Sequence, residues 1–182
     1  MIWLFFELTV IAIVFLLIFC ALMVVILGLL AEFWGAPFVP SNYQEMKAAL
    51  ELAKIKKGEK FVDLGSGEGS AVRWAAKYYQ AVAIGYEIHP MLVGYSRFVS
   101  WIQNLKKTNF YNRNLFSADI SDVHVLYLFL LPKTLAKLKN KLERELPKGT
   151  RVIAHGFKIP GWDKKLKTKI DRKLFPTYLY IR

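Results

Sequence analysis

Two patterns of apolar and polar positions divide this chain. From Leu8 to Ala31 no residue is charged, and the run is long enough for a helix that crosses a bilayer, which needs ~20 apolar residues. Beyond residue 42, short apolar runs bounded by turn residues alternate with stretches of helical periodicity. We expect strands over 60–64, 81–87, 109–114, 123–130, 150–156 and 174–181, and helices over 42–55, 69–79, 90–105 and 133–146. Because strand and helix alternate, the pattern predicts an α/β fold with a parallel sheet.

The N-terminal run favours a retained anchor over a cleaved signal peptide. Aromatic residues flank it, with Trp3 on one side and Trp34 on the other, as they do at the two interfaces of a membrane. A signal peptide would have a basic start, a shorter apolar core and a small-residue cleavage site, and none of these is clear. We therefore expect a transmembrane anchor over 1–33, a proline-containing linker over 34–41 and a soluble domain over 42–182.

Basic residues give the chain a formal net charge of +12. All 26 Lys and Arg follow the apolar run, so the positive-inside rule predicts a single-pass membrane protein with its soluble domain on the cytoplasmic or organellar matrix side. The charge fits an anionic lipid surface, a nucleic acid or solvent alone. Lipid is the economical partner for a tethered domain, and nucleic acid is not expected because no motif for it is present. The basic run at 164–169 is either the lipid contact or a solvated hairpin edge.

Cysteine and histidine residues give no sign of a metal centre. Cys20 is the only cysteine and lies in the apolar run, so neither a disulfide framework nor a thiolate metal site is available. The three histidines, His89, His124 and His155, lack ligand-like spacing. The sequence therefore predicts no metal.

The chemistry is concentrated in the glycine-rich turn after the first predicted strand. Residues 60–70 read KFVDLGSGEGS, with three glycines at alternate positions that allow a tight turn and close approach of a ligand to the backbone. A dinucleotide fingerprint requires Gly or Ala where this chain has Ser70, and Asp63 at the strand end would repel a pyrophosphate. S-Adenosylmethionine carries a sulfonium and an ammonium and no phosphate, so it suits an acidic turn. The residues expected to bind this cofactor are Asp63, Gly65, Ser66, Gly67 and Gly69.

Glu87 ends the second predicted strand and supplies a second carboxylate. It lies about 20 residues beyond the glycines, where an acid at the end of the second strand accepts both ribose hydroxyls of a nucleotide cofactor. Two acids at two strand ends, with the glycine turn between them, form a specific signal for this kind of cofactor.

From about Gly35 to about Trp162 the chain resembles a known family. Residues 62–69, VDLGSGEG, resemble motif I of the seven-β-strand, S-adenosylmethionine-dependent methyltransferases. Further segments resemble, in order, the membrane-anchored protein-lysine methyltransferases of the ATP synthase c subunit and the adenine nucleotide translocase: PFVPS at 37–41, GYEIHP at 85–90, YSR at 95–97, KLEREL at 141–146 and RVIA at 151–154. The resemblance implies N-methylation of lysine. It also implies a Rossmann-like seven-stranded methyltransferase sheet that ends in an antiparallel strand, preceded here by one N-terminal transmembrane helix.

One position departs from that family. The family has an Asp after its third strand, where adenine is contacted, and this chain has Asn114 there. An Asn side-chain oxygen still accepts a hydrogen bond from an amino group, so the resemblance implies Asn114 as a further cofactor ligand. Asp119 is the alternative, although an acidic loop residue that caps the next strand is its commoner role.

The acceptor amine is expected beyond the carboxyl end of the fourth strand, where open α/β sheets bind ligands. A lysine starts near pKa 10.4, and an apolar pocket lowers that pKa because it disfavours the charged form, so no dedicated strong base is required. Leu128 and Leu130 are expected to be buried strand residues, which leaves Leu131 and Pro132 to line the pocket.

These observations predict a membrane-anchored enzyme that transfers methyl groups from S-adenosylmethionine to lysine side chains of a membrane-associated protein. A small-molecule methyltransferase acting on a quinone or a lipid would use the same anchor and cofactor. A non-catalytic, S-adenosylmethionine-binding membrane module is the other alternative, and only the departure at Asn114 supports it.

Overall fold

The helices and strands of this protein end at turn residues of the sequence. The structure is a computed structural model. It describes residues 2–33, 43–171 and 174–182, and within the first helix it describes the side chains of 3, 7–23 and 25. The helices are α1 (Ile2–Phe33), α2 (Tyr43–Leu52), α3 (Ser70–Tyr79), α4 (Pro90–Ile102), η1 (Leu115–Ser117), α5 (Pro132–Glu145) and η2 (Asp163–Lys165). The strands are β1 (Lys60–Leu64), β2 (Val82–Glu87), β3 (Thr108–Asn112), β4 (Val125–Leu128), β5 (Arg151–His155), β6 (Leu166–Ile170) and β7 (Thr177–Ile181).

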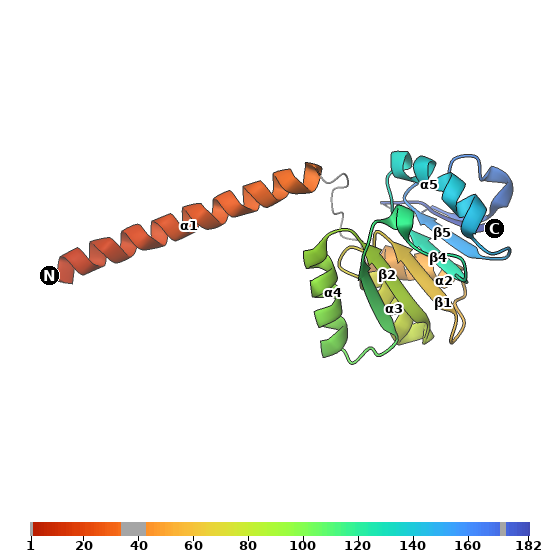
Figure 1. The fold of residues 1–182 in the computed structure, drawn as a ribbon, viewed down its shortest axis with the longest axis horizontal. Coiled ribbons are helices and arrows are strands. Elements are labelled where there is room, and N and C mark those ends of the chain that lie inside the picture. The colour runs from red at the N-terminus through yellow and green to blue at the C-terminus, as the bar shows by residue number, and fades with distance from the viewer. Residues whose placement is uncertain (1, 34–42, 172–173) are drawn as a thin grey trace. The chain divides into compact units, whose positions relative to one another are not determined.

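The chain divides into two compact units, Met1–Pro40 and Ser41–Arg182, and α1 belongs to the first (Figure 1). Among the described residues, no helix combines the length and the apolar character that crossing a membrane requires. The predicted transmembrane helix is therefore not established by the structure. The predicted linker over 34–41 lies outside the described residues.

The second unit contains the predicted sheet. Within the described residues, seven strands form one sheet in the order β3-β2-β1-β4-β5-β7-β6. β1 to β5 are parallel, and β7 joins β5 in the antiparallel direction, which confirms the Rossmann-like methyltransferase sheet. The strand order runs outward from β1 to β3 and then restarts with β4 on the other side of β1. Ligands of open α/β sheets bind at the carboxyl ends of the strands beside such a reversal, so β1 and β4 determine where the site lies.

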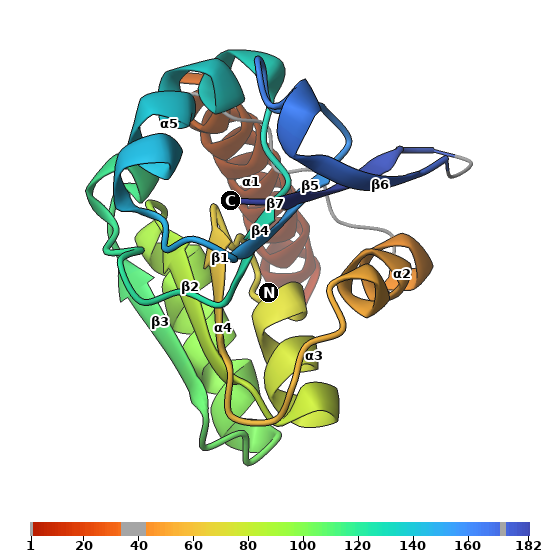
Figure 2. The same cartoon turned by 90° about the vertical axis from the view of Figure 1, so that its right-hand side faces the viewer.

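Helices cover both faces of this sheet (Figure 2). On one face, α2, α3 and α4 contribute Met46, Leu50, Val72, Ala75 and Val93 to a core with Phe61, Tyr127 and Ile153 of the strands. On the other face, α5 contributes Leu135, Leu138 and Leu142 to a core with Leu64 and Leu128. Because side chains alternate along a strand, Asp63 lies on the face that α2 and α3 cover.

The strand β6 is absent from the sequence prediction, and it forms from the basic run at 164–169. It lies at the sheet edge and pairs only with β7 among the described strands. Lysines on an edge strand discourage pairing with another chain. Two lysines of the basic run already have carboxylate partners, since Lys165 lies 3.6 Å from Glu143 and Lys169 lies 2.6 Å from Asp171. The run therefore forms a hairpin edge, and its contact with lipid stays a prediction.

Two predicted helices end earlier than their patterns suggest. The helix expected over 42–55 stops at Leu52, and the helix expected over 90–105 stops at Ile102. In each case a residue just beyond the end has a left-handed backbone, Lys54 with φ 47° and Asn104 with φ 52°. A left-handed residue ends the α-helical hydrogen-bonding pattern, and periodicity alone does not reveal it.

Candidate active site

The glycine turn joins β1 to α3 and packs against β2. Gly65, Gly67 and Gly69 all have positive φ, at 82°, 53° and 81°, a region that only glycine adopts without strain. The N–H groups of Gly65 and Ser66 donate to the carbonyl of Tyr86 at 2.8 and 3.0 Å. The three alternating glycines therefore adopt the positive-φ turn conformation that the sequence predicts.

The turn also lies close to β2 and β3. A Cβ at Gly69 would come within 2.5 Å of the Phe110 ring, and one at Gly85 would come within 2.6 Å of Ser66 Oγ. The Ser66 hydroxyl is buried and has no hydrogen-bond partner among the described residues. This tight fit brings the turn beside the carboxyl end of β2.

Glu87 is held rigidly at that end of β2. Its Oε2 accepts the N–H of Gly67 at 2.9 Å, and its Oε1 accepts the N–H of His89 at 2.9 Å. Asn112 donates from Nδ2 to the carbonyls of Glu87 and Ile88 at 3.1 and 2.8 Å, a supporting contact that the sequence did not reveal. Each carboxylate oxygen keeps further lone-pair capacity, so a fixed acceptor remains for hydroxyl groups.

Asp63 is the buried member of the carboxylate pair. It is 4% exposed, and burial raises its pKa to about 8, with the charge of Glu87 adding to the shift. In the sheet register it lies between Gly85 of β2 and Tyr127 of β4. A buried carboxylate beside a second carboxylate is stabilised by a cation, which is what a sulfonium or ammonium group supplies.

The two candidates for the adenine contact both have local capping roles. Asn114 accepts the N–H of Phe116 through Oδ1 at 3.0 Å and so caps η1. Asp119 accepts the N–H and the hydroxyl of Ser121 at 3.0 and 2.7 Å, and these bonds lower the pKa of its carboxyl group. Both residues are exposed, and their roles toward the cofactor stay predictions.

Leu131 and Pro132 lie at the start of α5. Leu131 is 41% exposed, and its carbonyl accepts the N–H groups of Thr134 and Leu135 at 3.0 Å each. That carbonyl is therefore engaged in starting the helix. The structure does not bring these two residues into contact with Asp63 or Glu87 in any described interaction, so their pocket-lining role also stays a prediction.

A cluster of rings lies at the carboxyl ends of β4 and β5, on the same sheet face as Asp63. The His155 ring centroid is 4.7 Å from that of Phe129 and 5.8 Å from that of Phe175, and Phe129 and Phe175 are 5.3 Å apart. A Cβ at Gly156 would come within 3.1 Å of Phe129. We call Phe129, His155 and Phe175 the ring cluster.

His155 of the ring cluster also forms a buried polar pair with Glu45 of α2. His155 Nε2 lies 3.7 Å from Glu45 Oε2, and its Nδ1 lies 2.9 Å from Thr177 Oγ1. Burial lowers the pKa of His155, and the nearby charge of Glu45 opposes that shift. Glu45 Oε1 also accepts the N–H of Leu174 at 3.1 Å, so this pair joins α2, β5 and the segment before β7.

Sequence reasoning does not find this second group of residues. From the sequence, His155 is considered only as a metal ligand. Among the described residues no three His, Cys, Asp or Glu side chains gather as metal ligands would. The one available signal is the position of His155 at the end of a predicted strand, on the sheet edge where ligands bind.

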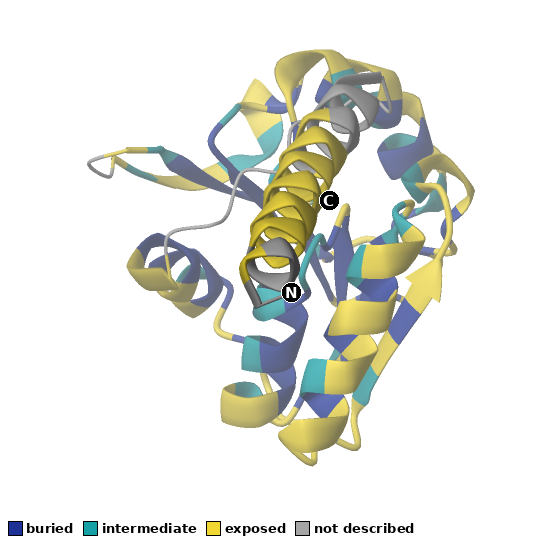
Figure 3. Ribbon diagram, turned by 90° about the vertical axis from the view of Figure 1, so that its left-hand side faces the viewer, coloured by how far each residue is buried: buried dark blue, intermediate teal, exposed yellow. Residues whose placement is uncertain are grey.

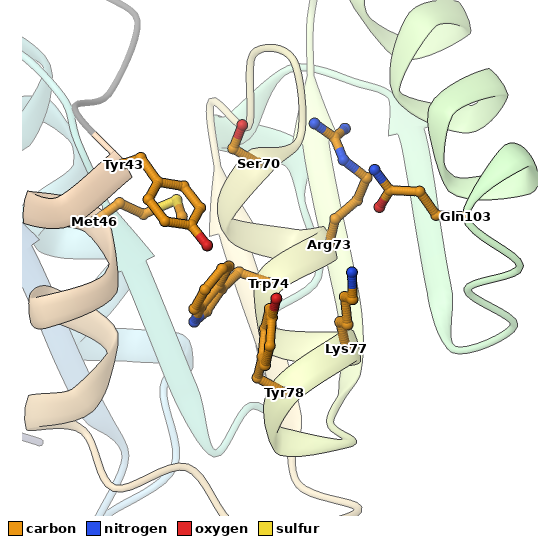
Figure 4. A pocket seen from close by; sticks show the side chains of 8 residues that line it. All are labelled: Tyr43, Met46, Ser70, Arg73, Trp74, Lys77, Tyr78 and Gln103. Atoms are coloured by element: carbon orange, nitrogen blue, oxygen red, sulfur yellow. The ribbon is translucent and has the colours of Figure 1, made fainter.

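A shallow cavity of about 200 Å³ lies elsewhere, between α2 and α3 (Figure 4). Its lining residues are Tyr43, Met46, Ser70, Arg73, Trp74, Lys77, Tyr78 and Gln103. The Tyr43 and Trp74 rings meet edge to face at 4.7 Å, and Trp74 and Tyr78 lie 3.8 Å apart. Neither Asp63 nor Glu87 lines the cavity, so it is separate from the carboxylate pair.

The sheet order, the glycine turn and the two carboxylates define an S-adenosylmethionine-dependent methyltransferase. The residues fit this cofactor because Gly65, Gly67 and Gly69 place no side chain over the backbone of the turn, and the carboxylate pair favours a cation over a phosphate. The chain belongs to the family of the ANTKMT methyltransferase domain, whose model matches residues 63–166.

Relatives named as lysine methyltransferases share much of the chain. A protein-lysine N-methyltransferase of Saccharolobus islandicus is 34% identical over 154 residues, which is 80% of this chain and 92% of the relative. Two mammalian relatives, the adenine nucleotide translocase lysine N-methyltransferase of Mus musculus and the lysine N-methyltransferase of the ATP synthase c subunit from Homo sapiens, are each 36% identical over 69% of this chain. This chain matches only 55% and 54% of their lengths.

A solved structure agrees with the fold and with the cofactor. The RNA methyltransferase from Salinibacter ruber, in complex with S-adenosyl-L-homocysteine, has a TM-score of 0.76 and 33% identity, and the match covers 79% of this chain and 93% of that one. S-Adenosylhomocysteine is the demethylated form of the cofactor, so S-adenosylmethionine is the cofactor of this family.

Proposed function

We propose that this protein is a membrane-anchored protein-lysine N-methyltransferase whose substrate is a membrane-associated protein. The observation that carries the proposal is the buried Asp63 carboxylate beside Glu87, on the sheet face that also bears the ring cluster. The names of the archaeal and mammalian relatives support lysine as the acceptor.

The cofactor residues have distinct proposed roles. Glu87, fixed by two backbone N–H groups, accepts the ribose hydroxyls. Asp63 receives the cationic amino-acid end, and Gly65, Ser66, Gly67 and Gly69 let the ligand approach the backbone. Asn114 contacts adenine through its amide group, with Asp119 as the alternative. S-Adenosylmethionine supplies a methyl group on a sulfonium, which is a good leaving group for displacement by an amine.

The acceptor amine enters on the β4 and β5 side of Asp63. Glu87 holds the ribose on the β2 side, so the methyl-bearing end of the cofactor is directed toward β1 and β4. The ring cluster borders that position, and half-buried Phe129 and Phe175 offer apolar and aromatic surface to a lysine side chain. Apolar surroundings lower the pKa of the lysine, and the aromatic faces still attract its cationic form. Leu131 and Pro132 form the outer apolar wall.

The membrane anchor is part of the same proposal. It is supported by the uncharged sequence from Leu8 to Ala31. The anchor over 1–33 and the linker over 34–41 place the methyltransferase domain, 42–182, on the cytoplasmic or matrix side, where a net charge of +12 favours an anionic lipid surface.

The test is transfer of radiolabelled methyl groups from S-adenosylmethionine to a membrane fraction by the full chain. We expect a labelled protein band that contains methyl-lysine after hydrolysis and that disappears with Asp63→Asn. Asp122→Asn is the matched control, because Asp122 is exposed and pairs with Lys60 at 2.6 Å, away from the glycine turn.

Other outcomes would replace the proposal with a named alternative. Label confined to the lipid extract identifies a quinone or lipid methyltransferase, and label removed by ribonuclease identifies an RNA methyltransferase. Cofactor binding without transfer to any fraction identifies the non-catalytic module.

A further inference from the structure

α4 turns its large apolar side chains away from the sheet. Its buried residues are Val93, Ser96 and Ser100, which are small or polar. Its exposed large side chains are Met91 (67% exposed), Tyr95 (50%), Phe98 (56%), Trp101 (76%) and Ile102 (61%). Their spacing of four, three, three and one residues puts them on one side of the helix, opposite the buried residues. We call these five residues the α4 stripe.

The other long helix of the domain has the usual arrangement. α5 buries Leu135, Leu138 and Leu142 and exposes Lys133 and Lys137. Figure 3 shows exposed residues along the outer sides of the domain's helices. α4 differs because its exposed side chains are large and apolar, whereas a surface helix normally exposes polar side chains and buries apolar ones.

The charged residues in the sequence around α4 have one sign. Between Glu87 and Asp119 the sequence contains no Asp or Glu. Arg97 is the only charged residue of α4, and its guanidinium donates to the carbonyl of Phe110 at 3.0 and 2.6 Å. The exposed Lys106 and Lys107 follow the helix. An apolar, aromatic stripe with cations at its end, in a segment that contains no acidic residue, is complementary to an anionic lipid surface.

We propose that the α4 stripe lies in the interfacial layer of an anionic bilayer and provides a second membrane contact. Trp, Tyr and Phe side chains are enriched at this depth, where an apolar ring meets hydrated headgroups. The inference extends the proposed anchoring by α1 to a surface of the methyltransferase domain itself. It is independent of the basic run at 164–169, two of whose lysines already pair with carboxylates.

The position of α4 relates this membrane contact to the cofactor-binding edge of the sheet. The helix begins at Pro90, directly after the Glu87 turn, and its thirteen residues extend about 20 Å. Contact along α4 therefore holds the cofactor-binding edge of the sheet close to the bilayer surface, where lysines of a membrane protein emerge.

The test measures lipid exposure at single labelled positions of the full chain. A polarity-sensitive fluorophore is attached to Cys20 in the wild type, and to Phe98→Cys or Asn140→Cys in a Cys20→Ser background. Asn140 is the matched control because it is an exposed residue of α5. Each protein is reconstituted into vesicles of phosphatidylcholine and phosphatidylglycerol, and quenching by lipid-borne spin labels is recorded.

We expect several-fold stronger quenching at position 98 than at position 140, with weaker quenching at 98 in phosphatidylcholine alone. Quenching at Cys20 with none at 98 overturns the α4 contact and leaves the anchor intact. Equal exposure to water at Cys20 and at 98 overturns both. A blue shift at 98 in detergent that grows with protein concentration assigns the stripe to a second copy of the chain and also overturns the lipid contact.

Discussion

The two sides of the carboxyl edge are built in different ways. On the cofactor side, Asp63 and Glu87 belong to neighbouring strands, and the glycine turn between them bonds directly to both β2 and Glu87. On the proposed acceptor side, Phe129, His155 and Phe175 come from three separate segments, and His155 contacts a buried Glu45 from a fourth. The first side is a local motif, and the second exists only after the sheet and α2 have assembled.

This difference separates the tasks of the two sides. A cofactor shared across a large superfamily can be bound by backbone groups and two carboxylates, which a short motif encodes. The acceptor differs among methyltransferases, so its binding surface is assembled from positions that can change without disturbing the turn. The following predictions test whether the two sides are independent in this way.

Substitution of the crowded glycines should give the largest effect. Gly69→Ala is expected to lower the free energy of unfolding by about 3 kcal/mol, because it adds a clash with Phe110 to a left-handed backbone. Gly156→Ala, whose Cβ would meet Phe129 at 3.1 Å, should lose about 2 kcal/mol. Gly149→Ala has a similar φ of 85° and open space, so it should lose about 1 kcal/mol. Chemical denaturation of the three variants measures these values, and equal losses would contradict the packing described for both sides.

Removal of the buried carboxylate should act on the cofactor side alone. Asp63→Ala is expected to weaken S-adenosylmethionine binding by about 10- to 100-fold, the usual range for a lost charged acceptor. Glu87→Ala should weaken it similarly, and Asp122→Asn should not. Isothermal titration calorimetry measures the affinities, and wild-type affinity in both alanine variants would refute the proposed cofactor site.

Trimming the ring cluster should act on the acceptor side alone. Phe129→Leu is expected to lower methyl transfer by about 10-fold, because about 1.4 kcal/mol of aromatic contact with the lysine is lost. Its affinity for S-adenosylmethionine should stay unchanged. Phe116→Leu, at an exposed position of η1, serves as the control. A loss of cofactor affinity in Phe129→Leu would show that the two sides are not independent.

Proton linkage at Asp63 should give the most gradual effect. The folded carboxyl group keeps its proton up to a pKa of about 8, whereas the unfolded group ionises near 3.8. The folded state therefore binds more protons between these values, and the stability of the cofactor-free protein falls as pH rises through this window. A cationic cofactor favours the ionised carboxylate, so its affinity should rise about 10-fold per pH unit at most below pH 8. Calorimetry between pH 6 and 8.5 should show this rise in the wild type and a flat profile in Asp63→Asn.

The cofactor side was largely predictable because its signals are local. Three alternating glycines after an apolar strand indicate a turn that needs positive φ, and the structure gives Gly65, Gly67 and Gly69 that conformation. The carboxylates at the ends of β1 and β2 followed from strand boundaries alone. The sheet was predicted as well, apart from β6, whose alternating lysines have little apolar content to mark a strand.

The acceptor side and the α4 stripe were not predictable in the same way. Nothing near Glu45 in the sequence indicates that it meets His155, more than a hundred residues away. The apolar residues of α4 have ordinary helical periodicity, which indicates a helix without saying which side faces the sheet.

The sequence by itself determined the fold class, the cofactor and the two carboxylates at the ends of neighbouring strands, because turn conformation and strand periodicity depend on neighbouring residues. Only the tertiary structure decided what surrounds them. Packing of α2 against the sheet buried Glu45 beside His155, and burial in the assembled domain raised the pKa of Asp63, since burial depends on elements far apart in the chain. Packing of α4 through Val93, Ser96 and Ser100 likewise left its largest apolar side chains facing outward.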